Sequence, residues 1–126
     1  MKYLSEYMHD KQSQLFKETN AFFAFSQQQF NEGIIKGNKY TSLGGGLFCP
    51  SQHVKKLTEG LEKIYRDSIK EDIKENGLDK IIIRELYNHE CFYTGCYTEV
   101  VEKLTDYPGI TKEMIKALFY TEIKYI

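Results

Sequence analysis

The sequence predicts an α+β fold that is mostly helical and carries a small two- or three-stranded antiparallel sheet. Apolar residues recur every three to five positions over residues 54–73, which is typical of one face of a long helix. Two short strand-like segments, 39–43 and 47–49, flank the only glycine triplet, Gly44–Gly46. The aromatic run over residues 21–25 is too short for a helix and predicts a buried strand.

The remaining elements follow from start and stop signals. An amphipathic pattern predicts a first helix over residues 1–20. Residues that favour helix N-caps, Ser26, Ser51 and Asp79, predict where three further helices begin. Two more helices are expected to start at Thr98 and at Thr111. The helix after Ser26 is expected to run through Ile35 to Gly37, and the helix after Ser51 to Asn76-Gly77. The helix after Asp79 should reach about Cys91, followed by a turn over residues 92–97.

Length and composition limit the class of protein. The 126 residues suffice for one domain, and we predict a single domain over residues 1–126. A net charge of -1 without a basic stripe argues against direct specific nucleic-acid binding. No apolar run approaches the ~20 residues that cross a membrane. Residues 1–16 are polar and amphipathic and do not resemble a signal peptide. Three cysteines, an odd number, do not imply a closed disulfide framework, so we expect the protein to be located in a reducing cytoplasm.

The glycine triplet suggests an anion site. Glycines let backbone N–H groups approach a ligand, and the predicted helix N-terminus nearby favours negative charge. However, Leu47-Phe48-Cys49 stands where a phosphate-binding loop would carry lysine and serine or threonine. A turn or bulge in a small sheet is the simpler interpretation. A nucleotide- or anion-sequestering module using Gly44–Gly46 stays as the alternative function.

Cysteine and histidine side chains form a second candidate constellation. Structural zinc takes four thiolate or imidazole ligands, typically as two pairs from separate segments. Cys49 with His53 and His89 with Cys91 supply two such pairs, although their spacings match no standard zinc finger. We therefore predict one structural zinc ion on these four residues, with Cys96 able to replace His53. The simpler alternative is that Cys49 and Cys91 are small buried residues.

Enzymatic activity has the least support. Cys49 with His53, or Cys91 with His89, could form a nucleophile and base, and a thiolate at a helix N-terminus is favoured by the helix dipole. No nucleophile elbow or HExxH pattern accompanies either pair. We predict that the protein is not an enzyme and has no catalytic residues.

Three blocks of sequence carry a resemblance to a known family. They are Ala21–Gly33, then Ser42–Gly46 with Phe48-Cys49-Pro50, then Asn88-His89-Glu90-Cys91. Together they resemble small phage and mobile-element proteins, most without an assigned role, some of which look like inhibitors of type II CRISPR nucleases. His53 and Cys96 are not positions associated with that family, which leaves open whether a metal site is a local feature of this chain.

The resemblance implies a non-enzymatic inhibitor in an infected bacterial cytoplasm. Its partner would be the type II CRISPR nuclease or the complex of that nuclease with its guide RNA, without a membrane and without direct nucleic-acid recognition. Interfaces of this kind depend on a few aromatic anchors. Tyr93, Tyr97 and Tyr107 lie around the predicted turns over residues 92–109 and are the candidate anchors; the alternative is that they close the core.

Overall fold

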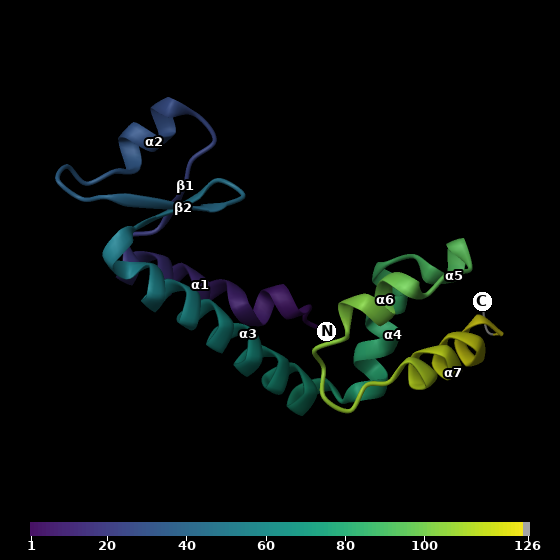
Figure 1. Ribbon diagram of the computed structural model, residues 1–126. Helices are drawn as coiled ribbons and strands as arrows, with labels where there is room; N and C mark the ends of the chain where they lie inside the picture. Colours follow the sequence, from purple (N-terminus) through teal and green to yellow (C-terminus); the bar gives the residue numbers. More distant parts are fainter. Residues whose placement is uncertain (125–126) are drawn as a thin grey trace. The chain divides into compact units, whose positions relative to one another are not determined.

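The computed structural model describes residues 1–124 and confirms the predicted fold class, helices with a small three-stranded antiparallel sheet (Figure 1). Contacts divide the chain into two compact units, residues 2–68 and the residues from Ile69 onward. Helix α3 (Val54–Asn76) contributes to both. A single domain stays a prediction, because two compact units can unfold together or separately. No helix among residues 1–124 is both long and apolar enough to cross a membrane.

The first unit packs helix α1 (Leu4–Thr19) along the first part of α3 (Figure 1). Leu15, Cys49 and Leu57 form the buried centre of its core. The two helices approach closely because position 60 is glycine: a Cβ there would lie 2.7 Å from the Leu15 side chain. Asn20 ends α1 in the left-handed conformation, with its N–H donating to the Phe16 carbonyl.

The sheet of this unit has the order β1-β3-β2, with β1 (Phe22–Phe23), β2 (Tyr40–Gly44) and β3 (Leu47–Pro50). The hairpin predicted around the glycine triplet is confirmed. Gly45 and Gly46 have φ of 60° and 83°, the left-handed region that a tight hairpin turn requires. The register pairs Thr41 with Cys49 and is shifted between Ser42 and Gly44.

The aromatic run is less buried than predicted. Only Phe22 and Phe23 pair as a strand, and this strand lies at the edge of the sheet. Phe23 and Phe25 are exposed, and Phe25 retains 75% of its accessible surface. A short edge strand buries one face only, and on that face Phe22 contacts the rings of Phe30, Tyr40 and Phe48.

Helix α2 (Gln27–Gly33) begins as predicted and ends earlier. The Ser26 hydroxyl accepts a hydrogen bond from the Gln29 N–H at 3.2 Å, and the Gln29 side chain accepts one from the Phe25 N–H at 2.7 Å. Ile34 is already extended, because the Ile35 N–H donates to the Tyr40 hydroxyl and turns the chain toward β2.

Two predicted helix caps are wrong. A 3₁₀ turn, η1 (Ser51–His53), precedes α3, and the Ser51 hydroxyl contacts the Thr41 hydroxyl at 2.8 Å. Helix α4 (Leu78–Asn88) begins after Gly77, so Asp79 lies in its first turn and does not cap it. Gly77 does follow α3 with a positive φ of 81°, but its ψ of 157° is extended and not left-handed helical.

The second unit packs α4 against α6 (Thr98–Lys103) and α7 (Lys112–Ile123). Ile81, Ile82 and Leu86 of α4 are buried, together with Val100, Leu104, Ile115 and Phe119. The last helix begins at Thr111 as predicted, and Thr111 is its N-cap, since its side chain accepts from the Met114 N–H. The predicted turn over residues 92–97 contains a short helix, α5 (Cys91–Thr94), which ends at Gly95 in the left-handed conformation.

The aromatic contact behind α2 yields a first testable prediction. A Cβ at Gly33 would lie 2.4 Å from the Phe22 ring, so Gly33→Ala must displace a ring that three other aromatic side chains hold. We expect a loss of about 1–3 kcal/mol in the free energy of unfolding, measured by urea denaturation. In a Phe22→Leu background the same change should cost clearly less. Equal costs in both backgrounds would contradict the ring contact.

Candidate functional site

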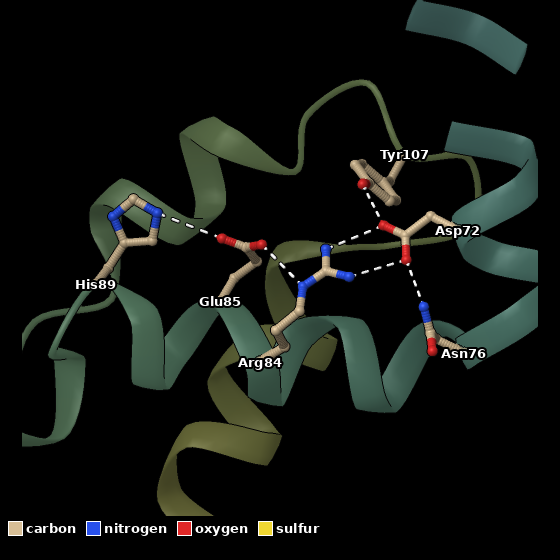
Figure 2. Close-up of polar contacts among 6 residues, drawn as sticks. All are labelled: Asp72, Asn76, Arg84, Glu85, His89 and Tyr107. Carbon is tan, nitrogen blue, oxygen red and sulfur yellow. Dashed lines mark hydrogen bonds and ion pairs between the residues drawn. The ribbon is translucent and has the colours of Figure 1, made fainter. Parts of the chain in front are cut away.

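A buried ion pair joins the end of α3 to α4 in the second unit. The Arg84 guanidinium donates from Nη1 and Nη2 to the two carboxylate oxygens of Asp72, at 2.8 and 3.0 Å (Figure 2). Both side chains are almost completely removed from solvent. A planar guanidinium fork on a carboxylate is the strongest geometry for such a pair. This contact fixes the face of α4 that turns toward the end of α3.

Asp72 accepts two further hydrogen bonds. The Tyr107 hydroxyl donates to it at 2.6 Å and the Asn76 amide at 2.8 Å (Figure 2). Burial by itself raises the pKa of Asp72, but the hydrogen bonds from Arg84, Tyr107 and Asn76 and the charge of Arg84 more than offset burial, so the pKa lies below its ordinary value. Burial and the Asp72 carboxylate raise the pKa of Tyr107. The phenol therefore stays protonated and the carboxylate stays ionised near neutral pH.

The network continues along α4 to its C-terminal end. The Arg84 Nε donates to Glu85 at 3.0 Å, and the other carboxylate oxygen of Glu85 lies 3.5 Å from Nε2 of His89. The His89 Nδ1 faces Glu99 at 3.2 Å. Nε2 of His89 and this Glu85 oxygen are buried and have no hydrogen-bond partner among residues 1–124, so their contact is an ion pair only when the ring is protonated. His89 thus lies next to the network of Asp72, Arg84 and Glu85 (Figure 2).

Beyond His89 lies an open pocket of about 540 Å³. Tyr87, Phe92 and Tyr93 line it together with Glu90. The ring centroids of Tyr87 and Phe92 are 4.8 Å apart, and Phe92 stacks on the core residue Phe119 at 5.4 Å. Tyr93 keeps 91% of its accessible surface and Tyr87 52%. The pocket therefore combines one ring anchored in the core with two rings exposed to solvent.

Glu90 holds the turn between α4 and α5 in a strained conformation. Its φ of 54° and ψ of 33° lie in the left-handed region. Glycine adopts this conformation freely and asparagine does so fairly often, whereas other residues adopt it at an energetic cost. The turn is closed by the Glu90 N–H, which donates to the Tyr87 carbonyl at 3.1 Å. The Glu90 carbonyl in turn accepts from the Tyr93 and Thr94 N–H groups. The same bonds place Tyr87, Glu90 and Tyr93 around the pocket.

The predicted zinc ligands belong to different units. Cys49 and His53 lie in the first unit, and His89 and Cys91 in the second. Burial raises the pKa of both the Cys49 and the Cys91 thiols, as expected of small buried residues. Among residues 1–124, no group of three or more His, Cys, Asp or Glu side chains is placed to hold a metal ion. The four-ligand zinc site stays a prediction.

The other candidate residues fall as follows. Cys96 is exposed, and a hydrogen bond with Thr98 lowers the pKa of its thiol. Gly44–Gly46 form the β2–β3 turn, and β3 separates them from the start of α3, so they do not adjoin the N-terminus of that helix. Of the three candidate anchors, Tyr93 is exposed, Tyr97 packs on Phe119, and Tyr107 is 3% exposed and belongs to the core.

Sequence reasoning missed Asp72, Arg84, Glu85 and Glu90. A signal for Asp72 was present, since it lies three residues after Ile69 and four after Ser68, within the apolar stripe of α3. Arg84 and Glu85 lie between Ile82 and Leu86, so a helix buried on that face must bury charges as well. Nothing in the local pattern marks Glu90, because its conformation depends on how α5 follows α4.

Comparisons with known proteins give one match. Residues 4–120 match a family described as a family of unknown function, DUF7659. No curated protein and no solved structure matches the chain.

The ion pair predicts a large loss of stability when one partner is removed. Asp72→Asn removes the bidentate carboxylate partner of the buried Arg84 and should cost about 3–5 kcal/mol of unfolding free energy. Tyr107→Phe removes one hydrogen bond and should cost about 1–3 kcal/mol, which keeps the chain folded. The control Glu62→Gln breaks an exposed pair with Arg66 and should cost less than about 1 kcal/mol. Equal effects of all three variants would contradict the network.

The lowered pKa of Asp72 predicts the direction of a pH effect. A depressed native pKa contributes stability above the ordinary carboxyl pKa of about 4, and this contribution is lost as pH falls through the native value. Tyr107→Phe removes part of that depression. Urea denaturation at pH 7 and pH 3 should therefore show a larger loss for the unsubstituted protein than for Tyr107→Phe. A constant difference between the two proteins would mean that the hydrogen bond does not depend on the charge of Asp72.

Proposed function

The chain belongs to the DUF7659 family, whose function is unknown, and we propose that this protein acts without catalysis, by binding another protein. The contact surface is the aromatic face, which we define as Tyr87, Phe92, Tyr93, Tyr97 and Tyr120. One observation carries the proposal: Tyr93 presents 91% of its surface beside a pocket lined by two more aromatic rings. Exposed aromatic residues held by a rigid scaffold are typical binding anchors.

The packing behind the aromatic face supports a preformed surface. The rings of Phe92, Tyr97 and Tyr120 all contact Phe119, which is buried. Tyrosine and phenylalanine lose little conformational entropy on binding, and rings already held by their neighbours lose less. A partner that covers Tyr93 therefore gains apolar burial at a low ordering cost.

For the partner, we propose a type II CRISPR nuclease or its guide-RNA complex, which this protein would inhibit. The support is the resemblance of residues 21–33, 42–46 with 48–50, and 88–91 to small phage and mobile-element proteins, some of which look like such inhibitors. Asn88–Cys91, the last of these blocks, adjoins the aromatic face, and Glu90 lines its pocket. An inhibitor of this kind would block guide loading, DNA loading or the domain movement that permits cleavage.

A nucleotide-sequestering role for Gly44–Gly46 has less support. These glycines turn a β-hairpin, and a Cβ at Gly46 would meet the Phe25 ring, so Gly46 is explained by the turn and by this contact. No helix begins directly after them to attract an anion.

The proposal predicts that Tyr93 anchors binding. Tyr93→Ala should weaken capture of the nuclease at least about thirtyfold, as loss of an aromatic anchor does, and should relieve inhibition of DNA cleavage. Its melting temperature should not change, because Tyr93 is almost fully exposed. Phe25→Ala, which removes an exposed ring of the first unit, is the matched control and should bind normally.

Three outcomes would count against the proposal. Capture and inhibition unaffected by Tyr93→Ala would place the contact elsewhere. Loss of binding by Phe25→Ala alone would move it to the sheet of the first unit. Absence of capture by any type II nuclease tested would reject the nuclease as partner.

A further inference from the structure

Among residues 1–124, the pocket of the aromatic face is lined by three rings and one charged side chain. Tyr87, Phe92 and Tyr93 contribute the rings, and Glu90 contributes a carboxylate. Glu90 is exposed, and the interactions described for residues 1–124 include no ion pair for it. By contrast, Glu85 and Glu99, the neighbouring carboxylates along the network, both face His89. The pocket thus holds a negative charge that the described part of the chain does not neutralise.

The backbone at Glu90 gives an independent reason to single it out. Among residues 1–124, only Asn20 and Glu90 have positive φ without being glycine. Asn20 ends a helix, where asparagine is a common left-handed residue. Glycine would relieve the strain at residue 90, yet the chain carries a long charged side chain there. Strained positions that persist in a fold cluster at functional sites.

We propose that this pocket binds an arginine side chain of the partner protein. The faces of aromatic rings carry negative electrostatic potential and attract a cation. A guanidinium is planar, so it can stack on Tyr87, Phe92 or Tyr93 and still direct its N–H fork to the Glu90 carboxylate. Lysine offers a compact, strongly hydrated charge and neither stacks nor forks, so arginine is the better occupant.

The chemistry of the pocket disfavours other occupants. An anionic group, including a nucleic-acid phosphate, would be repelled by Glu90 and by the ring faces. An apolar side chain would cover the carboxylate without giving it a hydrogen bond, which carries a desolvation cost. Arginine satisfies the rings through its plane and the carboxylate through its N–H groups. This inference depends on the proposed function in one respect, namely that the arginine belongs to a partner protein.

The buried network keeps this pocket in place. Arg84 and Glu85 hold α4 from its inner face, and Tyr87 follows on the same helix. Phe92 is held from behind by Phe119. A site whose side chains are supported by a packed second layer binds with less reorganisation.

A pair of small probes tests the pocket without a partner. Acetyl-Gly-Arg-Gly-amide and acetyl-Gly-citrulline-Gly-amide have nearly the same shape and differ in charge. Each is titrated into the full ¹⁵N-labelled chain, and amide shifts are followed by NMR. We expect saturable shifts at Tyr87–Tyr93 with the arginine probe and at least about fivefold weaker binding of the citrulline probe. The lysine analogue should also bind more weakly than arginine.

Three variants identify the carboxylate. Glu90→Gln keeps the shape of the side chain and should reduce the affinity for the arginine probe to that for the citrulline probe. Glu90→Gly should also lose the preference for arginine while raising the melting temperature, since glycine relieves the positive φ. Glu59→Gln removes an exposed charge from the first unit and should leave binding unchanged.

The outcomes separate this inference from the proposed function. Equal binding of the arginine and citrulline probes, no shifts at residues 87–93, or unchanged binding by Glu90→Gln would each overturn the arginine pocket. Tighter binding of lysine than of arginine would overturn the choice of guanidinium. Failure to capture a nuclease would reject that partner and would leave the probe result standing.

Discussion

The arrangement of the second unit depends on the bidentate contact between Asp72 and Arg84. Burying a carboxylate at the end of α3 is unfavourable unless a cation and hydrogen-bond donors meet it there. This requirement selects the face of α4 that carries Arg84 and draws Tyr107, from the segment after α6, to the same point. Apolar side chains alone would tolerate several rotations of α4 about its axis. A buried ion pair of this geometry forms in only one rotation of α4. We therefore regard the ion pair as specifying how α4 packs more than as adding to net stability.

The same helix divides its charged groups between two roles. Arg84 and Glu85 are both buried, and Arg84 donates to Glu85 and to Asp72. At the C-terminal end, Glu90 leaves the helix through a left-handed turn and lies in a pocket among aromatic rings. The inner charges pair with one another, whereas Glu90 has no ion pair in the part of the chain that the structure describes. That contrast, within a few residues of one helix, is the basis for assigning a structural role to the first group and a recognition role to the second.

The sequence alone predicts much of this fold and little of the site. The stripe of α3, the β2–β3 hairpin around Gly44–Gly46 and the start of α7 at Thr111 were predictable because each depends on neighbours within a few positions. The Asp72–Arg84 contact joins residues twelve positions apart, and its formation depends on the angle between two helices that no periodicity records. The zinc ligands were chosen by residue type alone, and the four-ligand site stays a prediction. The exposed Phe23 and Phe25 were predicted as buried because hydrophobicity does not reveal which strand lies at an edge.

The direction of the pKa shifts bears on whether this unit performs catalysis or recognition. A general acid or base works best when its pKa lies near the working pH. The network moves both pKa values away from neutral pH, since it lowers the pKa of the Asp72 carboxyl and raises the pKa of the Tyr107 phenol. Each group is thereby held in one protonation state and serves as a fixed hydrogen-bond acceptor or donor. The outer surface presents aromatic rings and the Glu90 carboxylate, for which residues 1–124 provide no ion pair. Such a surface supplies shape, apolar area and charge, and these are the terms that determine binding of a cationic side chain.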